Sequence, residues 1–591
     1  MSQQDSHLSL VGNPNVPERE GITRPGFATY DGPVNIDGRL YRAGTWYHGI
    51  KQTSPDEPGQ PFDLWICSPL YIEAETIDSD DGSIGRLVRF YHRGRELEYV
   101  IPMEALAGKG DDVLKPLMRQ GLIVDYHHRK YIPAFVASHH TPDVVLTTTT
   151  RTGWHAGTGA FVMPHRVIGS DQVRYHGSGL EARVFDTRGS LEDWQTEVAT
   201  PCLGNPVLIV ALCCALSGPL LRKVGVNGGG IHLVGDSSSG KSLAQDVGAT
   251  VWGRPEGFKV SWDMSAGGVE IEATTRNDTV LIADEISRAN PKRLQEHIYA
   301  LANGSGKGTM TREREGRPKN HWCIPILSSG ERSAADHTGI SGQNAHAGAE
   351  LRMVDINAGT RTYRAFDDVH GMDGETFHRT LTGAVSRQFG HAGPALVEHL
   401  IDEDTAHGLP WRFGEIRRTF NVASAQAGRV ADRFAVMALA GELASEWKIL
   451  PWPPETAIQA CRLLFMEWLA TIGDGNAEDR QILTALADFI ALHGDSRFSD
   501  VNAQLAAHVS HRAGFYEIDN GRRLYLFNRA ALVEAVEGYS RDRILRTLGT
   551  HDVLARMDEG RKQKNYRLPG GGSARFFVID PDKLEPEGGA R

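Results

Sequence analysis

Cysteine is scarce in this chain, and no two cysteines form a Cys-x-x-Cys pair. Six cysteines in 591 residues predict neither a disulfide framework nor a cysteine zinc site. No apolar run reaches the roughly 18–20 residues of a membrane span. The best candidate, residues 206–221, is interrupted by Ser217-Gly218-Pro219. The N-terminus lacks the basic start and apolar stretch of a signal peptide. We therefore expect a cytoplasmic protein that does not enter a membrane.

An excess of positive charge is also missing. The net charge of −11 argues against a protein coated in nucleic acid, although a local basic channel remains compatible with it. Hydrophobic residues make up 40% of the chain and charged residues 23%, as in soluble globular proteins. No internal repeat or low-complexity tract is present. A chain of this length is too long for one core, so several domains are expected.

Composition and periodicity divide the chain into six segments. The first is polar and rich in Pro and Gly, the second alternates β-branched or aromatic runs with turns, and helical periodicity dominates residues 373–472. We expect a flexible tail at 1–38, a mostly β N-terminal domain at 39–176, a helical linker at 177–227, a nucleotide-binding core at 228–357, a helical lid at 358–478 and a winged-helix-like C-terminal domain at 479–591.

A glycine-rich loop of the phosphate-binding type follows a short apolar run. Residues 231–234 are Ile-His-Leu-Val, and residues 235–242 read Gly-Asp-Ser-Ser-Ser-Gly-Lys-Ser, the G-x-x-x-x-G-K-S pattern between a strand and a helix. In this pattern backbone N–H groups cradle phosphates, the lysine reaches the β- and γ-phosphates, and the serine hydroxyl ligates Mg²⁺. A glycine turn that binds nothing is the alternative. We expect ATP and Mg²⁺ as cofactors, bound by Gly235, Asp236, Ser237, Ser238, Ser239, Gly240, Lys241 and Ser242.

Two adjacent carboxylates end a second apolar run farther along the chain. Residues 279–285 read Thr-Val-Leu-Ile-Ala-Asp-Glu, which is typical of a buried parallel strand with ligand-binding groups at its carboxyl end. Asp284 is predicted to hold Mg²⁺ through water, and Glu285 to polarise the attacking water. Such a run is often a strand end without chemistry, but its position behind a phosphate loop favours the catalytic interpretation.

These motifs and their order resemble a family of mobile-element and phage proteins catalogued as a "domain of unknown function", AAA+ ATPases similar to the MCM replicative helicases and encoded by staphylococcal cassette-type elements and prophages. The resemblance covers roughly residues 44–451. It implies an α/β fold with an AAA+ P-loop NTPase core and a helical lid. It also implies that the protein forms a ring, most simply a hexamer, that moves along DNA. This chain departs from the MCM pattern in having no cysteine zinc site. The matching segments are GDSSSGKS, VWGRP (251–255), LIADEIS (281–287), ANGSGKG (302–308), ILSSGE (326–331) and AGELA (440–444).

The resemblance also implies roles for residues outside the two motifs. Ser329 or Ser328, at the end of an apolar run, takes the sensor-1 position that contacts the γ-phosphate or lytic water, where asparagine is commoner; a plain strand-end turn is the alternative. Arg352 is expected to act as an arginine finger on a neighbouring subunit's ATP, unless it is a surface arginine. Arg429, with Arg433 second, is expected at the sensor-2 position of the lid.

Two basic segments are candidate DNA contacts. Residues 307–319 hold five basic and two acidic side chains, and the resemblance makes them a pore hairpin whose Lys307 or Arg312 contacts the DNA backbone; a solvated loop is the alternative. Residues 541–575 hold nine basic and four acidic side chains in an order that resembles a winged helix, with Arg561 and Lys562 in the wing. Winged helices also bind proteins.

Three functions compete on these observations. The preferred one is an ATP-dependent DNA helicase for replication of a mobile element or phage, with single-stranded or forked DNA and copies of itself as partners; a primase or initiator is an open further partner. A superfamily-2 helicase is disfavoured, because helices rather than a second RecA-like domain follow Ser329. An AAA+ ATPase that regulates or remodels DNA- or protein-bound complexes without unwinding would share every nucleotide-binding motif.

Overall fold

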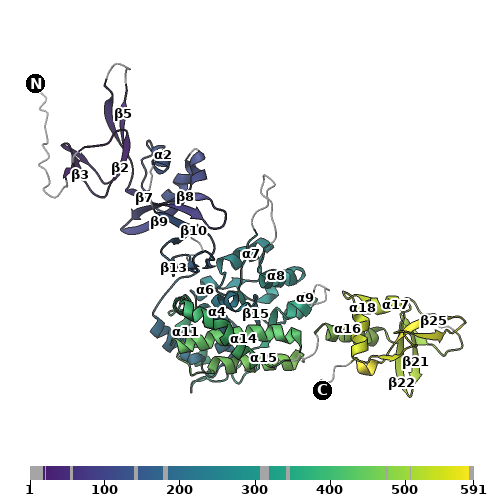
Figure 1. The fold of residues 1–591 in the computed structure, drawn as a ribbon. Helices are drawn as coiled ribbons and strands as arrows, with labels where there is room; N and C mark the ends of the chain where they lie inside the picture. The colour runs from purple at the N-terminus through teal and green to yellow at the C-terminus, as the bar shows by residue number, and fades with distance from the viewer. Residues whose placement is uncertain are drawn as a thin grey trace, which may run out of the picture. The chain divides into compact units, whose positions relative to one another are not determined.

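The computed structural model describes residues 18–19, 21–52, 58–108, 110–138, 144–177, 184–306, 319–340, 347–422, 424–472, 477–505 and 508–584. The chain forms two compact units, which divide between residues 182 and 183 (Figure 1).

The described part of the first unit consists mainly of β-strands. Period-2 alternation builds them: along residues 70–76 every second side chain is buried, and Leu70, Ile72 and Ala74 face the core. The strands are β1 (Glu18–Arg19), β2 (Gly26–Tyr30), β3 (Val34–Ile36), β4 (Arg39–Tyr41), β5 (Gly44–Lys51), β6 (Gln60–Cys67), β7 (Leu70–Asp78), β8 (Ile84–His92), β9 (Arg95–Pro102), β10 (Val145–Thr149), β11 (Gly153–Trp154), β12 (Phe161–Met163), β13 (Arg166–Ile168) and β14 (Val173–Tyr175), with helices α1 (Asp111–Arg119) and α2 (Tyr131–Ser138).

The start of this unit differs from the expected flexible tail. Residues 21–38 contain β2 and β3, and the side chains of Val34 and Ile36 are buried in a small core with Tyr30 and Tyr41. Composition averaged over residues 1–38 hid this alternation of apolar residues, because the polar residues before it dominate the average.

The largest sheet of the first unit has the strand order β14-β10-β7-β8-β9. Its two edge strands approach each other through side chains: the Arg174 guanidinium Nε of β14 lies 3.4 Å from the Glu98 carboxylate of β9, and the rings of Tyr99 and His176 are 5.4 Å apart. No backbone pairing between β9 and β14 occurs among the described residues. The sheet therefore curls into an incomplete barrel that side chains close along one seam.

The second unit is built on a parallel five-stranded sheet. Its order is β16 (Val260–Ser261), β17 (Leu281–Asp284), β18 (Pro325–Gly330), β15 (Gly229–Val234) and β19 (Met353–Asn357). Every neighbouring pair is parallel, and all residues of β18 are buried, as expected where helices cover both faces. It is the one all-parallel sheet of more than two strands in the described part of the chain, so the second RecA-like domain of a superfamily-2 helicase is not found there.

Helices cover this sheet on both faces (Figure 1). Helices α4 (Pro206–Leu221), α5 (Lys241–Ala249), α8 (Pro291–Asn303), α10 (Ala347–Glu350) and α15 (Thr456–Ile472) contact its strands. The other helices of this part of the unit are α3 (Leu191–Trp194), α6 (Pro255–Phe258), α7 (Ala266–Thr275), α9 (Ala334–Gly339), α11 (Gly374–Val385), α12 (Ala392–Leu400), α13 (Glu403–Arg418) and α14 (Ala425–Glu446).

Helix α4 is apolar on all sides. By length and composition residues 206–224 qualify as a membrane span, yet 83% of the apolar window is buried inside the protein. The helix packs against α5, α14 and α15, so its uniform hydrophobicity is explained by burial on every side. Residues 206–221, expected to be part of a linker, are a core element instead.

The last part of the chain is a mixed domain of helices and strands (Figure 1), in which β20 and β21 pair in parallel and the other strand pairs are antiparallel. Helices α16 (Ala477–His493), α17 (Arg529–Ala535) and α18 (Arg541–Thr550) share one core with the strands, which includes Ile482, Phe527 and Ile544. The strands are β20 (Phe498–Asp500), β21 (Gly514–Asp519), β22 (Arg522–Phe527), β23 (Leu554–Arg556), β24 (Lys564–Arg567) and β25 (Ser573–Ile579). Antiparallel pairing of β24 with β25 forms a two-stranded hairpin where the sequence suggested a wing.

Candidate nucleotide site

The phosphate-type loop joins β15 to α5 in the middle of the parallel sheet. Strand β15 is flanked by β18 on one side and β19 on the other, so the loop leaves the sheet where the strand order reverses, the usual ligand position of such sheets. Gly240 has φ +100°, and a Cβ there would come within 3.1 Å of both Ala365 and the Phe366 ring. Only glycine suits this position, because it tolerates the conformation and leaves room for the neighbours.

Lys241 lies inside the curl of this loop. Its ammonium Nζ donates to the carbonyl oxygens of Gly235, at 2.6 Å, and Asp236, at 2.7 Å, and to the Ser239 hydroxyl at 3.1 Å. The side chain is 7% exposed, and burial lowers the lysine pKa, while the carboxylates of Glu285 and Glu331 act in the opposite direction. The ammonium group is therefore held at the centre of a ring of loop atoms, where its charge can meet a phosphate.

The two carboxylates of the second motif lie at the same edge of the sheet. Strand β17 ends at Asp284, and the Ser329 hydroxyl of β18 donates to the Asp284 carboxylate at 2.7 Å. The backbone N–H of Glu285 points at the same hydroxyl, 3.4 Å away. Glu285 has φ +56°, a sparsely populated conformation for a non-glycine residue that is often found at functional sites. Parallel pairing thus joins Asp284, Glu285 and Ser329 in one cluster.

Ser328 belongs to a separate buried network. Its hydroxyl accepts from the Trp262 indole N–H at 2.8 Å and lies 2.8 Å from Nδ1 of His232, whose Nε2 lies 2.9 Å from the Arg332 carbonyl oxygen. Since only a protonated Nε2 can donate to that carbonyl, Nδ1 accepts the Ser328 proton. Burial lowers the pKa of His232 to about 4, which keeps the ring neutral near pH 7. Of the two serines that the sequence left open, Ser329 is the one facing the carboxylates.

The chemistry of the donors at this edge fits a magnesium ion. Ser242, at the start of α5, is exposed and Asp284 is partly buried, so a hydroxyl and a carboxylate offer the oxygen ligands that Mg²⁺ takes beside its waters and substrate phosphates. No group of three or more His, Cys, Asp or Glu side chains suited to a metal occurs among the described residues.

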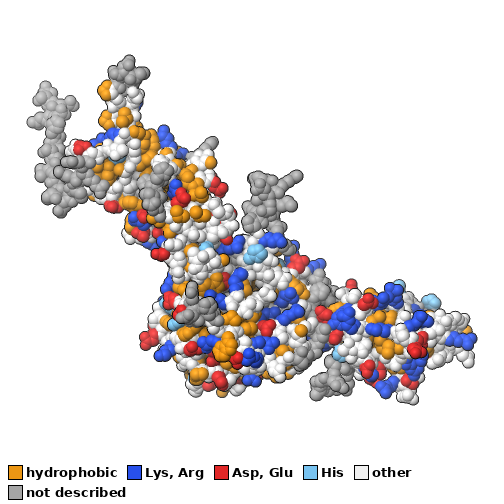
Figure 2. Space-filling view, viewed as in Figure 1, with side chains coloured by type: hydrophobic (Ala, Val, Ile, Leu, Met, Phe, Trp, Pro, Cys, Tyr) orange, Lys and Arg blue, Asp and Glu red, His pale blue; other side chains and the backbone are white. Residues whose placement is uncertain are grey.

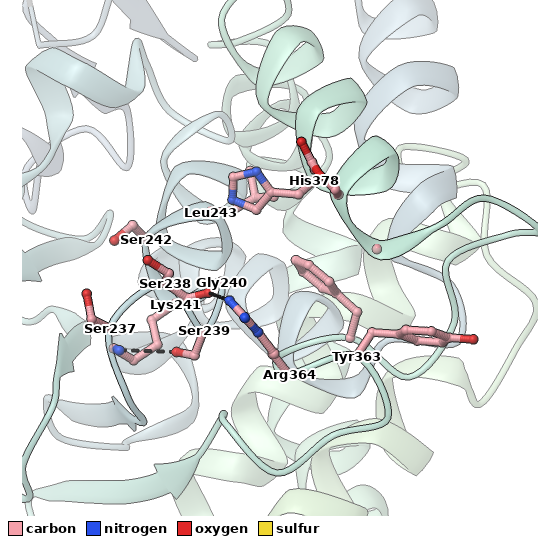
Figure 3. Close-up of a pocket in the computed structure, with 13 residues that line it drawn as sticks. Ser237, Ser238, Ser239, Gly240, Lys241, Ser242, Leu243, Tyr363, Arg364 and His378 are labelled. Carbon is pink, nitrogen blue, oxygen red and sulfur yellow. Dashed lines mark hydrogen bonds between the residues drawn. The ribbon is translucent and has the colours of Figure 1, made fainter.

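A cavity of about 780 Å³ opens beside the loop, and residues that the sequence analysis did not single out line one side of it. This side comes from the segment after β19 and from the start of α11. The Arg364 guanidinium Nη1 donates to the Ser238 carbonyl oxygen at 2.8 Å, and Figure 3 shows this side chain pointing at the loop, with His378 on the side of Leu243. The only sequence signal was a run of basic and aromatic residues directly after the fifth strand, at 361–366.

The other predicted arginines lie near the opposite end of the sheet within one chain. Arg352 precedes β19, and its carbonyl pairs with the N–H of Gly230 at the start of β15. Its guanidinium donates to the Gly348 carbonyl at 2.8 Å and lies 4.4 Å from the Tyr299 ring centroid. Arg429 is exposed on α14, while Arg433 is buried and donates to the Leu351 carbonyl. In one chain, therefore, neither Arg352 nor Arg433 reaches the phosphate loop.

The expected DNA contacts are only partly described. Lys307 and Arg312 lie outside the described residues. Arg561 and Lys562 are exposed between β23 and β24, and the Lys562 ammonium donates to the Leu545 carbonyl at 2.9 Å. On the face drawn in Figure 2, basic and acidic side chains are interspersed over the C-terminal domain. Any basic contact surface there is local.

Comparisons with known proteins bear on the fold and the family. Residues 38–321 match the family model described as "Domain of unknown function (DUF927)", which confirms the resemblance seen in the motifs. A solved structure described as "SCCmec type IV Cch - active helicase" has a TM-score of 0.66 at 16% sequence identity, over 92% of this chain and 97% of that chain. The two chains thus share an overall fold. No curated protein matches the sequence.

A second solved structure is far less similar. It is described as "The A form apo structure of NrS-1 C terminal region-CTR" and has a TM-score of 0.29 at 10% identity, over 85% of this chain and 96% of that chain. Nothing about the fold follows from so low a score.

The two adjacent serines should respond differently to substitution. Ser329→Ala is expected to lower the ATPase kcat by roughly ten- to a hundredfold, because the hydroxyl that aligns Asp284 and Glu285 is lost. Ser328→Ala, its neighbour, leaves Trp262 and His232 without their buried partner and should lower the free energy of unfolding by about 1–3 kcal/mol, with a smaller effect on kcat. Steady-state ATPase assays and denaturant unfolding measure the two effects. A fully active Ser329→Ala variant would show that this hydroxyl has no role in turnover.

Arg364 should contribute to nucleotide affinity. We expect Arg364→Ala to raise the KM for ATP about tenfold, which corresponds to about 1.4 kcal/mol, because a cation is removed from the cavity wall beside the loop. Arg379→Ala is the matched control, since Arg379 is exposed on the nearby helix α11 but does not line the cavity. Equal KM values for the two variants would place Arg364 outside the nucleotide site.

Proposed function

We propose that this chain, which carries a DUF927 domain over residues 38–321 and has the fold of the Cch structure, is an ATP-dependent DNA helicase. The observation that carries the proposal is the convergence of Lys241 with Asp284, Glu285 and Ser329 at one edge of the parallel sheet. The likeness in fold adds support, because the Cch protein of similar structure is described as an active helicase.

The site residues divide the work of ATP hydrolysis between them. The backbone N–H groups of residues 235–242 and the Lys241 ammonium would bind the phosphates. Ser242 and Asp284 would hold Mg²⁺, which neutralises phosphate charge. The Glu285 carboxylate would accept a hydrogen bond from the attacking water and polarise it, and Ser329 would keep the carboxylates in place. Each of these groups lies at, or directly beside, the phosphate loop.

A ring is the assembly that this arrangement favours. Arg352 contacts Tyr299 and Gly348 at the end of the sheet remote from its own phosphate loop, so it could act only on the ATP of a neighbouring subunit, as an arginine finger. Arg429, which is exposed on α14, would take the sensor-2 role. We propose a homo-oligomer, with a hexamer as the specific form, and replication of a mobile element or phage as its setting.

DNA contact is the part of the proposal that separates a helicase from a regulator. Lys307 or Arg312 would contact the phosphates of DNA in the pore of the ring. Arg561 and Lys562 would contact DNA phosphates at the C-terminal domain, since such contacts need only positive charge. An AAA+ ATPase that remodels complexes without unwinding would share the whole nucleotide site. Strand displacement therefore decides between the two functions.

The helicase proposal predicts distinct defects for two substitutions. Lys241→Ala should abolish ATP hydrolysis and displacement of one strand from forked DNA, because the phosphates lose their main cation. Glu285→Gln should keep ATP binding but hydrolyse roughly a hundredfold more slowly or worse, since the amide cannot polarise water. Strand displacement, ATPase and nucleotide-binding assays on each variant test this. Wild-type protein that hydrolyses ATP but never separates forked DNA would favour the remodelling function.

Mixed oligomers test the placement of Arg352. Subunits with Arg352→Ala and subunits with Lys241→Ala are each expected to be nearly inactive alone. Mixing them should restore part of the ATPase activity, because some interfaces then combine an intact arginine with an intact phosphate loop. If subunits exchange, as shown by labelled protein, and no mixing ratio restores activity, Arg352 does not act across the interface.

A further inference from the structure

The first unit contains a cavity that the ATPase site does not use. It has a volume of about 520 Å³ and lies at the seam of the incomplete barrel, between the edge strands β9 and β14 and one face of α1. Its walls include Tyr99 of β9, Lys115 and Arg119 of α1, and Arg174 of β14 with the following His176. The cavity exists because side chains, rather than backbone hydrogen bonds, hold the two edges together.

The charge of this cavity is positive. Lys115 and Arg119 stand one helical turn apart on α1, so both side chains reach the same wall. Both are exposed, and within the described residues neither forms an ion pair or a side-chain hydrogen bond. Glu98 is the one carboxylate in the described lining, and Arg174 already pairs with it. Two uncompensated cations in a chain of net charge −11 favour an anionic ligand.

Two neutral aromatic rings line the same cavity. Tyr99 and His176 contact each other edge to face at 5.4 Å between ring centroids. Burial raises the pKa of the Tyr99 phenol and lowers the pKa of His176, so both rings are uncharged near pH 7. Planar neutral rings beside cations match the two contacts that nucleic acids offer, stacking on bases and neutralisation of phosphates.

The cavity continues as a groove. A second cavity of about 530 Å³ shares Glu98, Pro164, Arg174 and Tyr175 with the first and extends along β14 to the β12–β13 hairpin, where Arg166 lines it. A free nucleotide would need only the first cavity, whose volume already suits a small ligand. This extension carries Arg166 and Arg174 beside the carboxylates of Glu98 and Asp171, so the excess of positive charge lies at Lys115 and Arg119. The length of the groove matches consecutive nucleotides of a strand.

We propose that this seam binds single-stranded DNA, with Lys115 and Arg119 on backbone phosphates and Tyr99 and His176 against a base. The proposal rests on the proposed function, because a helicase supplies the single strand. It adds a site in the first unit, with residues other than Lys307, Arg312, Arg561 and Lys562.

The test is DNA binding by the full chain without ATP. Fluorescence anisotropy with a labelled oligothymidylate should show a Kd raised about ten- to a hundredfold by Lys115→Ala/Arg119→Ala, with the slope of log K against log salt reduced by about 1 to 2, as expected when two phosphate contacts are lost. Arg93→Ala/Arg95→Ala is the matched control, because it removes two exposed cations at the turn between β8 and β9 of the same unit. This control and the DNA-independent ATPase rate should stay close to wild type.

Cross-linking of the wild-type protein tests the proposal even if the double variant does not fold. An oligonucleotide carrying 4-thiothymine, irradiated with wild-type protein, should cross-link to peptides that contain Tyr99 or His176. Equal loss of affinity in both double variants, or cross-links that avoid both peptides, would overturn the proposal. If thymidine monophosphate competes as tightly as the oligonucleotide, the cavity is a site for free nucleotides and the single-strand assignment is wrong.

These outcomes are separate from the helicase assay. Wild-type protein that binds DNA at the seam but fails to unwind would reject the proposed function and leave the binding site intact. If the Lys115→Ala/Arg119→Ala variant unwinds forked DNA normally and binds oligothymidylate with unchanged affinity, the proposed function stands and the binding site at the seam is rejected.

Discussion

Parallel pairing of β15, β17 and β18 is the constraint on which the nucleotide site depends. Leu233 of β15 lies opposite Ser329, and Ala283 of β17 lies opposite Ser328, so the ends of all three strands reach one edge of the sheet together. The loop after β15 supplies Lys241, the end of β17 supplies the carboxylates, and β18 supplies the hydroxyl between them. A one-residue slip of β18 would exchange Ser329 for Ser328 and turn the wrong hydroxyl to Asp284.

The sequence predicts those parts of the site that depend on residues close together in the chain. Glycine at 240 and the spacing to Lys241 follow from the conformation of a single loop, and Asp284 and Glu285 follow from one strand that ends. The choice between Ser328 and Ser329 depended on His232 and Trp262, which are remote in sequence. Only the folded sheet brings those rings to one serine and leaves the other beside the carboxylates.

Other elements could not be predicted from the sequence for related reasons. Arg364 reaches the phosphate loop from an irregular segment, which has no periodicity to recognise. Strands β2 and β3 were hidden by the polar composition around them, and the seam between β9 and β14 arises from how far a sheet curls. The order of strands in the largest sheet of the first unit also depends on pairing between residues 70–78 and 145–149, a separation that no local pattern encodes.

Helix α4 has a consequence for how the second unit folds. Its whole circumference is apolar, and its partners α14 and α15 lie roughly two hundred positions or more later in the chain. Until those helices are synthesised, the side of α4 that they will cover stays exposed to water and prone to association. The helices after β19 are therefore needed to bury α4, and they are not a detachable cap. A nascent chain that stops after β19 would carry a complete phosphate loop on a sheet whose supporting helix is still unprotected.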